Sequence, residues 1–243
     1  MPKPHAILVY LGFDSRRVAQ YVVARHSILR RAKGPVEIIP LDLEDLQNRG
    51  LYTRPIQRIK NQMFDVISQA PMSTEFSLSR FWVPLLENYQ HGFSIYMDSD
   101  IVCTADIFEL LNEADRGTAV SVVKRTFAPA TKEKMDGQQQ VAYRCKNWSS
   151  VMIFNLGHED CKRLDPHTLN KYPGLYFHNF DWADAGIGRL PPVWNHLIGH
   201  DSPEDKPKLL HFTDGTPDIP GYEQGLYSAV WWAELHDAIR NPL

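Results

Sequence analysis

Cysteine is scarce in this sequence, and its three copies lie far apart. Cys103, Cys145 and Cys161 are odd in number, and no two of them are spaced as Cys-x-x-Cys. This pattern argues against a disulfide framework and against a cysteine zinc site. We therefore expect reduced thiols in a cytoplasmic protein.

Long hydrophobic runs are also missing. The apolar run at residues 6–11 is followed by Asp14, Arg16 and Arg17, with no small-residue cleavage site. A signal peptide is therefore not expected, and nothing approaches the roughly 18 apolar residues of a transmembrane helix. The arginine-rich stretch at 15–33 indicates a solvated helix face. Contact with an anionic acceptor, or a peripheral contact with a membrane, is the alternative.

Charge of one sign is not in excess. The chain holds 26 Lys and Arg against 29 Asp and Glu, a net charge of -3. This balance gives no general attraction to nucleic acid, which we do not expect as a partner. The chain has 243 residues, 43% of them hydrophobic, and shows no repeat or linker, so it is predicted to form a single α/β domain over residues 1–243.

The order of apolar segments supports an α/β fold. A strand at 6–11, a helix at 15–33 and a strand at 36–41 predict a βαβ unit with parallel strands. Further strands are expected at 93–97, 119–123, 151–155 and 209–212. Further helices are expected at 57–69, 74–89 (kinked or divided at Pro84), 107–111 and 227–239, and loops at 168–188.

The most informative triplet is Asp98-Ser99-Asp100, which directly follows the apolar segment 93–97. In an extended backbone, residues i and i+2 point to the same side, so the two carboxylates can converge on one ion. Open α/β sheets bind ligands at the carboxyl ends of their strands, and carboxylate oxygens suit hard cations such as Mg²⁺ or Mn²⁺. The alternative is a solvated turn, which Asp-x-Asp often forms by chance.

Four other segments carry recognisable patterns in a fixed order along the chain. They are Ser79-Arg80-Phe81-Trp82-Val83-Pro84-Leu85-Leu86, Asn147-Trp148-Ser149-Ser150-Val151-Met152-Ile153-Phe154-Asn155, Leu190-Pro191-Pro192-Val193-Trp194-Asn195, and Leu210-His211-Phe212 followed by Gly215. Together with Tyr96-Met97-Asp98-Ser99-Asp100, they resemble the segments of the family 8 glycosyltransferases, which include glycogenin and bacterial lipopolysaccharide galactosyltransferases. The resemblance spans residues 6 to about 217.

The resemblance implies a GT-A-type, Rossmann-like fold with a mostly parallel sheet flanked by helices. It also implies transfer of a sugar from a UDP-sugar donor to a hydroxyl of a glycan or other acceptor, with Mn²⁺ or Mg²⁺ and with retention of anomeric configuration. Residues 1–125 would form the nucleotide-binding half, and residues 126–243 the sugar and acceptor half.

The resemblance assigns the metal to Asp98, Asp100 and His211. An imidazole beside two carboxylates favours Mn²⁺ over Mg²⁺. Without the resemblance, His211 would be interpreted as a core histidine at the end of a strand.

Several residues are expected at the donor by the same resemblance. Arg80 would reach the sugar or the diphosphate, because a planar, permanently charged guanidinium suits phosphate; its alternative is a solvated helix residue. Asn147 would contact sugar hydroxyls, whereas Asn155 is expected to be structural. The remaining expected donor-binding residues are Tyr10, Gly12 and Asp14, which could equally form a tight turn with a helix cap, and Ser99 and Gly215.

Asp181 would stabilise positive charge at the anomeric carbon or act as a nucleophile, with Asp184 as a fallback. Here the sequence departs from the family, since Asp181-Trp182 replaces an Asp-Gln pair. The family's Gly-x-Lys-Pro-Trp stretch is also replaced, by Gly215-Thr216-Pro217-Asp218. Lys206 or Lys208 would have to take the place of its phosphate-binding lysine.

Two other functions fit the same residues. One is a nucleotidyltransferase acting on a sugar phosphate; the single glycine of Gly12-Phe13-Asp14-Ser15 counts against its Gly-rich phosphate loop. The other is a degenerate, non-catalytic module that binds a nucleotide sugar, which the missing lysine supports and the retained Asp98, Asp100 and His211 oppose.

Overall fold

The structure is a computed structural model that describes residues 6–60, 62–125, 133–134, 138–139, 145–202 and 206–243. A central six-stranded sheet has the order β12-β8-β11-β6-β1-β2. Its strands are β1 (Ile7–Gly12), β2 (Val36–Leu41), β6 (Phe93–Met97), β8 (Val120–Val122), β11 (Val151–Asn155) and β12 (Gly188–Arg189). All of them run in one direction except β11, which is antiparallel to both of its neighbours.

Side chains of the sheet alternate between two hydrophobic clusters, as the period of two along a strand requires. Val9 and Ile95 pack on one face with Ile28 of the helix α1 (Val18–Arg31). Tyr10 and Tyr96 pack on the other face with Phe81 and Trp82, which follow the helix α3 (Phe76–Ser79). Both faces are therefore covered, which makes the central strands almost fully buried.

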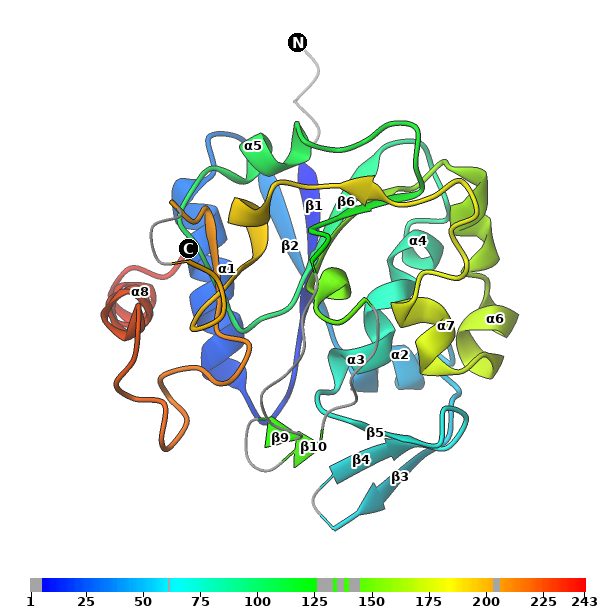
Figure 1. Cartoon of the computed structure of the whole chain (residues 1–243), viewed down its shortest axis with the longest axis horizontal. Helices are drawn as coiled ribbons and strands as arrows, with labels where there is room; N and C mark the ends of the chain where they lie inside the picture. The colour runs from blue at the N-terminus through cyan, green and yellow to red at the C-terminus, as the bar shows by residue number, and fades with distance from the viewer. Residues whose placement is uncertain (1–5, 61, 126–132, 135–137, 140–144, 203–205) are drawn as a thin grey trace.

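Helices cover the two faces of the sheet (Figure 1). The helix α5 (Ile107–Leu111) lies on the same face of the sheet as α1. The opposite face carries α2 (Leu43–Asn48), α3 (Phe76–Ser79), η1 (Arg80–Trp82), α4 (Val83–Leu86), α6 (Pro166–Lys171) and α7 (Gly174–His178). The expected mostly parallel α/β architecture is confirmed.

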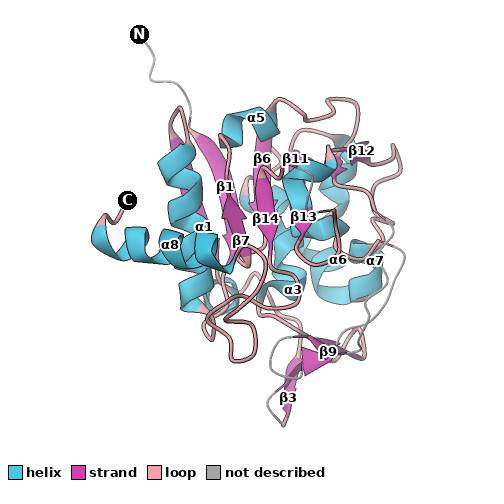
Figure 2. Ribbon diagram, turned by 60° about the vertical axis from the view of Figure 1, so that its left-hand side comes forward, coloured by secondary structure: helices cyan, strands magenta, loops and turns pink. Residues whose placement is uncertain are grey.

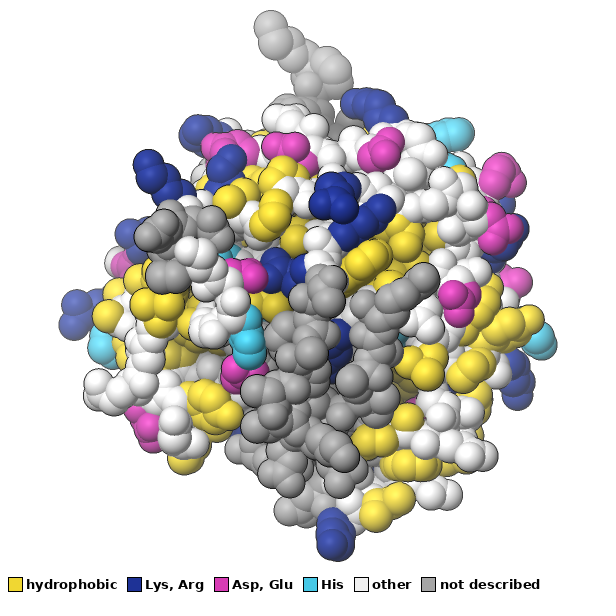
Figure 3. Space-filling model, in the orientation of Figure 1, with side chains coloured by type: hydrophobic (Ala, Val, Ile, Leu, Met, Phe, Trp, Pro, Cys, Tyr) yellow, Lys and Arg dark blue, Asp and Glu magenta, His cyan; other side chains and the backbone are white. Residues whose placement is uncertain are grey.

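The last helix, α8 (Ser228–Arg240), packs on α1 through a buried ionic cluster. Glu234 is 2% exposed, and its carboxylate lies 2.6 Å from Nδ1 of His26 and 2.9 Å from Nη1 of Arg31. Arg30 pairs with Asp237 of the same helix. Several arginines of α1 are thus used within the fold, and on the face shown in Figure 3 positive and negative side chains are interspersed. None of the described helices is long and apolar enough to cross a bilayer.

Smaller sheets surround the central one. In front of it, β13 (His196–Leu197), β14 (Leu209–His211) and β7 (Ile101–Cys103) form a three-stranded sheet (Figure 2). A meander of β3 (Ile56–Ile59), β4 (Gln62–Asp65) and β5 (Ala70–Met72) lies apart from it, and β9 (Glu133–Lys134) pairs with β10 (Gln138–Gln139). The short 3-10 helices η2 (Trp148–Ser150), η3 (Glu159–Arg163) and η4 (Pro192–Asn195) connect these parts.

Three sequence predictions of secondary structure need correction. The helix expected at 57–69 is wrong, because β3 and β4 occupy this segment as a hairpin that turns at Lys60, whose φ is 57°. In β4, buried residues alternate with half-buried ones, a period of two that the apolar spacing could not distinguish from a helix. The helix at 74–89 is broken into α3, η1 and α4, and the expected loop at 168–188 contains most of α6 and all of α7.

The meander is anchored by a buried ion pair. Arg54 and Asp65 are 2% and 1% exposed, and Nε of Arg54 donates to Oδ1 of Asp65 at 3.1 Å. Nη1 of Arg54 also donates to the carbonyls of Leu169 and Tyr172, at 2.9 and 2.7 Å. The pair therefore joins the meander to α6, and each of its two charges compensates the other.

We expect Arg54→Met to destabilise the protein by about 3–5 kcal/mol, because it leaves Asp65 as a buried, unpaired charge. The free energy of unfolding in urea measures this. Arg49→Met, in the exposed pair of Arg49 with Asp45, is the matched control and should cost about 0–1 kcal/mol. Equal effects of the two variants would contradict the prediction.

Candidate functional site

Several chain segments meet at one edge of the central sheet. The carboxyl ends of the parallel strands β1 and β6 lie there, and the antiparallel β11 begins there, with Val151 opposite Met97. Asp98-Ser99-Asp100 leads from β6 into β7, where Ile101 is paired with His211 of β14. Residues distant in sequence are therefore brought together where α/β sheets bind ligands.

Three potential metal ligands converge at this edge. Asp98, Asp100 and His211 each offer one ligand atom, and these atoms lie within 4.8 Å of one another. All three residues are buried, at 4%, 2% and 0% exposure. Nε2 of His211 approaches Oδ1 of Asp100 to 3.2 Å but makes no hydrogen bond to any described residue.

This donor set fits a divalent cation. Two buried carboxylates and an imidazole nitrogen without a hydrogen-bond partner form a site with two oxygen ligands and one nitrogen ligand, which suits Mn²⁺ or Mg²⁺. A cation would also offset the cost of burying two like charges side by side. The predicted ligands are thus placed together as a metal site requires.

Arg80 compensates the negative charge of Asp98. Its Nη1 lies 2.9 Å from Oδ1 of Asp98, and the hydroxyl of Tyr96 donates to the same oxygen at 2.7 Å. The guanidinium carbon lies 5.2 Å from the ring centroid of Tyr96 and 5.5 Å from that of Phe76, within range of a cation–π contact. Burial raises the pKa of Tyr96 well above 10, so this hydroxyl keeps its proton and remains a donor.

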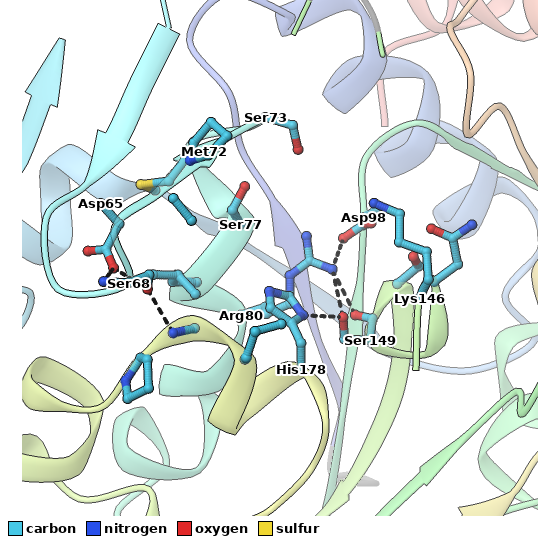
Figure 4. Close-up of a pocket in the computed structure, with 18 residues that line it drawn as sticks. Asp65, Ser68, Met72, Ser73, Ser77, Arg80, Asp98, Lys146, Ser149 and His178 are labelled. Atoms are coloured by element: carbon cyan, nitrogen blue, oxygen red, sulfur yellow. Dashed lines mark hydrogen bonds and ion pairs between the residues drawn. The ribbon is translucent and has the colours of Figure 1, made fainter. Parts of the chain in front are cut away.

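Arg80 and Asp98 line a cavity of about 190 Å³ (Figure 4). The cavity extends from these residues toward the meander, where Asp65 and Met72 line it, and toward the start of α7. Lys146 and Asn147 line it together with Asp98, and in Figure 4 the side chain of Lys146 points toward Asp98.

Ser149 and His178 also line the cavity (Figure 4). Nη1 of Arg80 donates to the carbonyl of Ser149 at 3.0 Å, and the hydroxyl of Ser149 lies 3.0 Å from Nδ1 of His178. Burial, followed by the positive charges of Arg80 and Lys146, holds the pKa of His178 well below 6.5. His178 is therefore a neutral residue of the wall.

Asn147 lines the cavity and has an amide nitrogen without a hydrogen-bond partner among the described residues. The residue is 7% exposed, and its Nδ2 makes no hydrogen bond to any residue that the structure describes. Its φ of 64° lies in the left-handed region, which asparagine tolerates better than most residues. A buried donor without a protein partner fits a contact with a ligand hydroxyl. By contrast, Nδ2 of Asn155 donates to the carbonyls of Arg116 and Thr118, a structural role.

The three donor-binding residues expected at the end of the first strand do not lie together. Tyr10 donates its hydroxyl to Glu87 on the α4 side of the sheet, away from the cavity. Gly12 lies beside the site, because a Cβ there would come within 2.9 Å of the Tyr96 hydroxyl and 2.6 Å of the Phe76 ring. Asp14 is 1% exposed, and burial would raise its pKa, yet the hydrogen bonds and charge of Arg16 hold it below 3.8.

Ser99 lies between Asp98 and Asp100 in the sequence, and Gly215 follows His211 by four residues. Ser99 is fully buried between the two acids, and its hydroxyl has no hydrogen-bond partner among the described residues. Gly215 is buried and ends the turn after β14, where its N–H donates to the carbonyl of Phe212 at 3.0 Å, and a Cβ there would meet the ring of Tyr222 at 2.8 Å. Packing against Tyr222 is thus enough to explain this glycine.

Asp181 and Asp184 are not brought to the cavity of Asp98. Both are exposed and line a different cavity, together with Lys124 and Arg189. Asp184 is paired with Arg163. The role expected for Asp181 gains no support from its position, and His178 occupies the cavity wall instead.

The lysines expected to replace the family's phosphate-binding residue also lie elsewhere. Lys208 donates to Glu109 at 2.8 Å and lies 5.1 Å from the ring centroid of Trp194. Lys206 is exposed and does not line the cavity.

Sequence reasoning missed Tyr96, Lys146, His178 and Asn195, all of which support the site. Tyr96 had a usable signal, since it precedes Asp98 by two residues and so points to the same side of the strand. Lys146 is adjacent to the expected Asn147, but the direction of a side chain in a loop is not encoded by spacing. Assigning His178 to the site would have required the position of α7, and the sequence did not predict this helix.

Comparison with solved structures identifies the fold as that of GT-A glycosyltransferases. The galactosyltransferase LgtC, solved with donor and acceptor sugar analogues, is 12% identical, with 95% of this chain and 96% of LgtC covered and a TM-score of 0.56. The glycosyltransferase GlyE of Streptococcus pneumoniae is 17% identical, with 95% and 61% covered and a TM-score of 0.54. The bifunctional glycosyltransferase WbbM is 16% identical, with 96% and 52% covered and a TM-score of 0.50. The chain thus spans about half the length of the WbbM chain and about three fifths of the GlyE chain.

Sequence comparison places the chain more narrowly. No sequence-family model matches it. It is 36% identical over 235 residues to Protein CDI of Arabidopsis thaliana, with 94% of this chain and 86% of the plant protein covered. The chain belongs to the family of this plant protein.

The neutral state of His178 predicts a pH dependence of stability. Below pH 6.5 the unfolded chain binds a proton at this residue that the folded chain does not, so stability is lost as the pH falls. We expect His178→Gln to lose less stability than the wild type between pH 7.5 and pH 5, measured by urea unfolding. The variant His167→Gln, at an exposed position, is the control and should follow the wild type; parallel losses in all three proteins would refute the prediction.

Proposed function

We propose that this protein is a metal-dependent, retaining glycosyltransferase of the family 8 type, which moves a sugar from a UDP-sugar to an acceptor hydroxyl. The observation that carries the proposal is the convergence of Asp98, Asp100 and His211 at the carboxyl end of β6 in a GT-A fold. Their spacing, burial and chemistry suit a cation that also binds a diphosphate.

In this proposal Asp98, Asp100 and His211 hold Mn²⁺ or Mg²⁺. When bound, the cation supplies Lewis-acid stabilisation of the charge that develops on the departing diphosphate, an effect of several kcal/mol. Mn²⁺ is favoured by the imidazole ligand.

Arg80 orients the donor and stabilises charge within the cavity. Its guanidinium is held by the carbonyl of Phe76 at 3.2 Å, by Ser149 and by Asp98. A cation fixed in this way is preorganised, so it can stabilise developing negative charge without reorganisation. Asn147 would donate its unpaired Nδ2 to a sugar hydroxyl and so set the position of the ring.

Lys146 is our candidate for the phosphate-binding lysine, which is missing from the segment 215–218. It lines the same cavity as Asp98 and Asn147, and its side chain points toward Asp98. A lysine is a compact charge on a flexible stem, which suits a phosphate oxygen whose position is set by other groups. Lys208 cannot serve in its present position, because it is engaged with Glu109 and Trp194.

The carboxylates of the cavity favour one route to retention. Two carboxylates, those of Asp65 and Asp98, are among the described residues that line the cavity. Each of them is paired with an arginine. A carboxylate held by a buried arginine is a weak nucleophile, because its negative charge is already stabilised. We therefore favour attack of the acceptor hydroxyl on the face that the diphosphate leaves, with a donor phosphate oxygen receiving the proton, over a covalent intermediate on Asp181.

Asp100→Asn should abolish cooperative binding of metal and nucleotide. The melting temperature of the wild type should rise with Mn²⁺ and UDP together more than with either alone, since ligands of the native state stabilise by mass action. We expect the variant to lose this shift and to release UDP from a UDP-sugar about 100-fold or more slowly. Asp106→Asn, which alters a buried helix cap of α5, is the control and should keep both properties. Release of pyrophosphate from UTP and a sugar 1-phosphate, with no release of UDP from the UDP-sugar, would indicate nucleotidyl transfer instead.

Lys146→Met should weaken UDP binding in the presence of Mn²⁺ by about 10–100-fold, because a hydrogen bond to a charged group contributes about 1.5–3 kcal/mol. Isothermal titration calorimetry measures the dissociation constant. Lys208→Met is the matched control and should bind UDP as the wild type does. An unchanged constant for Lys146→Met would remove Lys146 from the donor site while leaving the metal ligands untouched.

A further inference from the structure

Asn195 joins two parts of the candidate site that are far apart in sequence. It ends η4 and is fully buried. Its Nδ2 donates to the carbonyl of Asn147 at 3.0 Å, and its Oδ1 lies 2.8 Å from Nδ1 of His211. One carboxamide therefore contacts both the loop expected at the sugar and a proposed metal ligand.

The contact with Asn147 fixes the direction of the carboxamide. A carbonyl oxygen can only accept a hydrogen bond, so the group of Asn195 that faces Asn147 must be the NH₂ group. The Oδ1 atom must then face His211. Because Oδ1 is also only an acceptor, Nδ1 of His211 has to carry a proton for this 2.8 Å contact to be favourable.

We propose that Asn195 is a positioning residue that holds His211 with Nδ1 protonated, so that the lone pair of Nε2 is directed at the cation bound by Asp98 and Asp100. This inference rests on the proposed metal site. A histidine ligand is commonly oriented in this way by a hydrogen bond from its other ring nitrogen to an oxygen acceptor. Without Asn195, Nε2 could instead carry the proton and donate it to Asp100, 3.2 Å away.

The environment of Asn195 explains why it can hold this position. Its own backbone carbonyl accepts a hydrogen bond from Nη2 of Arg125, whose Nη1 pairs with Asp201. Asp201 in turn accepts from the backbone amide of Leu197 at 2.7 Å. The backbone at Asn195 and at Leu197 is therefore fixed by the pair of Arg125 and Asp201.

Two substitutions separate the orienting role from general packing. Asn195→Leu has a similar volume but no acceptor for Nδ1 of His211 and no donor for Asn147. Asn195→Asp keeps an acceptor for Nδ1 and loses the donor to Asn147. Both variants should be less stable than the wild type. Only Asn195→Leu should remove the hydrogen bond that keeps the proton on Nδ1 of His211.

Asn170 offers a matched control. It is 7% exposed, its Nδ2 donates to the carbonyls of Leu51 and Pro166 at 2.9 Å, and its Oδ1 accepts from the amide of Thr53. Asn170→Leu therefore also removes buried amide hydrogen bonds, in a part of the protein away from His211.

The test is a long-range ¹H–¹⁵N correlation spectrum of the full-length protein labelled at histidine, with His211 assigned from the spectrum of His211→Gln. In the wild type we expect a protonated Nδ1, both without metal and with Mg²⁺ and UDP. Asn195→Asp and Asn170→Leu should retain it, and Asn195→Leu should show a bare Nδ1. In parallel, the Mn²⁺ dissociation constant should rise about 10–100-fold in Asn195→Leu and remain within a few-fold of the wild type in the other two variants.

The outcomes separate this inference from the proposed function. A bare Nδ1 in the wild type, or a protonated Nδ1 and unchanged Mn²⁺ affinity in Asn195→Leu, would overturn the role of Asn195. An equal loss of Mn²⁺ affinity in Asn170→Leu would overturn it as well, by showing that lower stability is the cause. If the wild type binds no metal at all, the proposed metal site fails, whereas the spectra without metal still decide whether Asn195 orients His211.

Discussion

The burial of two acidic side chains side by side is the constraint on which the rest of the site depends. Asp98 and Asp100 are 4% and 2% exposed. Burying two uncompensated charges would cost more free energy than the net stability of a typical folded protein. Arg80 and Tyr96 stabilise the charge on Asp98. Asp100 faces the unbonded nitrogen of His211, which stabilises a carboxylate only if a proton or a cation lies between them.

This constraint explains why so many separate segments end at one place. Arg80 has to be held rigidly if it is to compensate Asp98, and it is held by Phe76 in the preceding helix and by Ser149 in the loop before β11. The same loop brings Asn147 to the cavity, and the carbonyl of Asn147 holds Asn195. The charges, the cavity wall and the ring of His211 are thus parts of one hydrogen-bonded arrangement, in which a change at one residue affects the others.

Sequence reasoning predicted those parts of the structure that depend on neighbours along the chain. The strand at 93–97 could be predicted because it is a short apolar run, and it is buried on both faces. The convergence of Asp98 and Asp100 could be predicted because residues i and i+2 of an extended chain point to the same side. His211 could be assigned only by resemblance, because its partner β7 lies over 100 residues away in the chain. The segment 57–69 was predicted wrongly because its apolar spacing fits both a helix and a hairpin. The position of Asp181 depends on how the chain passes α7, which no local pattern specifies.

The segment Gly215-Thr216-Pro217-Asp218 after β14 carries no lysine where the resembling family has Gly-x-Lys-Pro-Trp. Thr216 is fully buried, accepting from Nε2 of Gln20 at 2.7 Å and donating to Asp218. The turn is thereby tied to α1 and does not present a cation to the cavity. In the proposed function Lys146 supplies that charge from the loop that also carries Asn147. The sugar and the diphosphate would then be recognised by consecutive residues of one loop, so the conformation of this loop, rather than of the turn after β14, would set how tightly the donor binds.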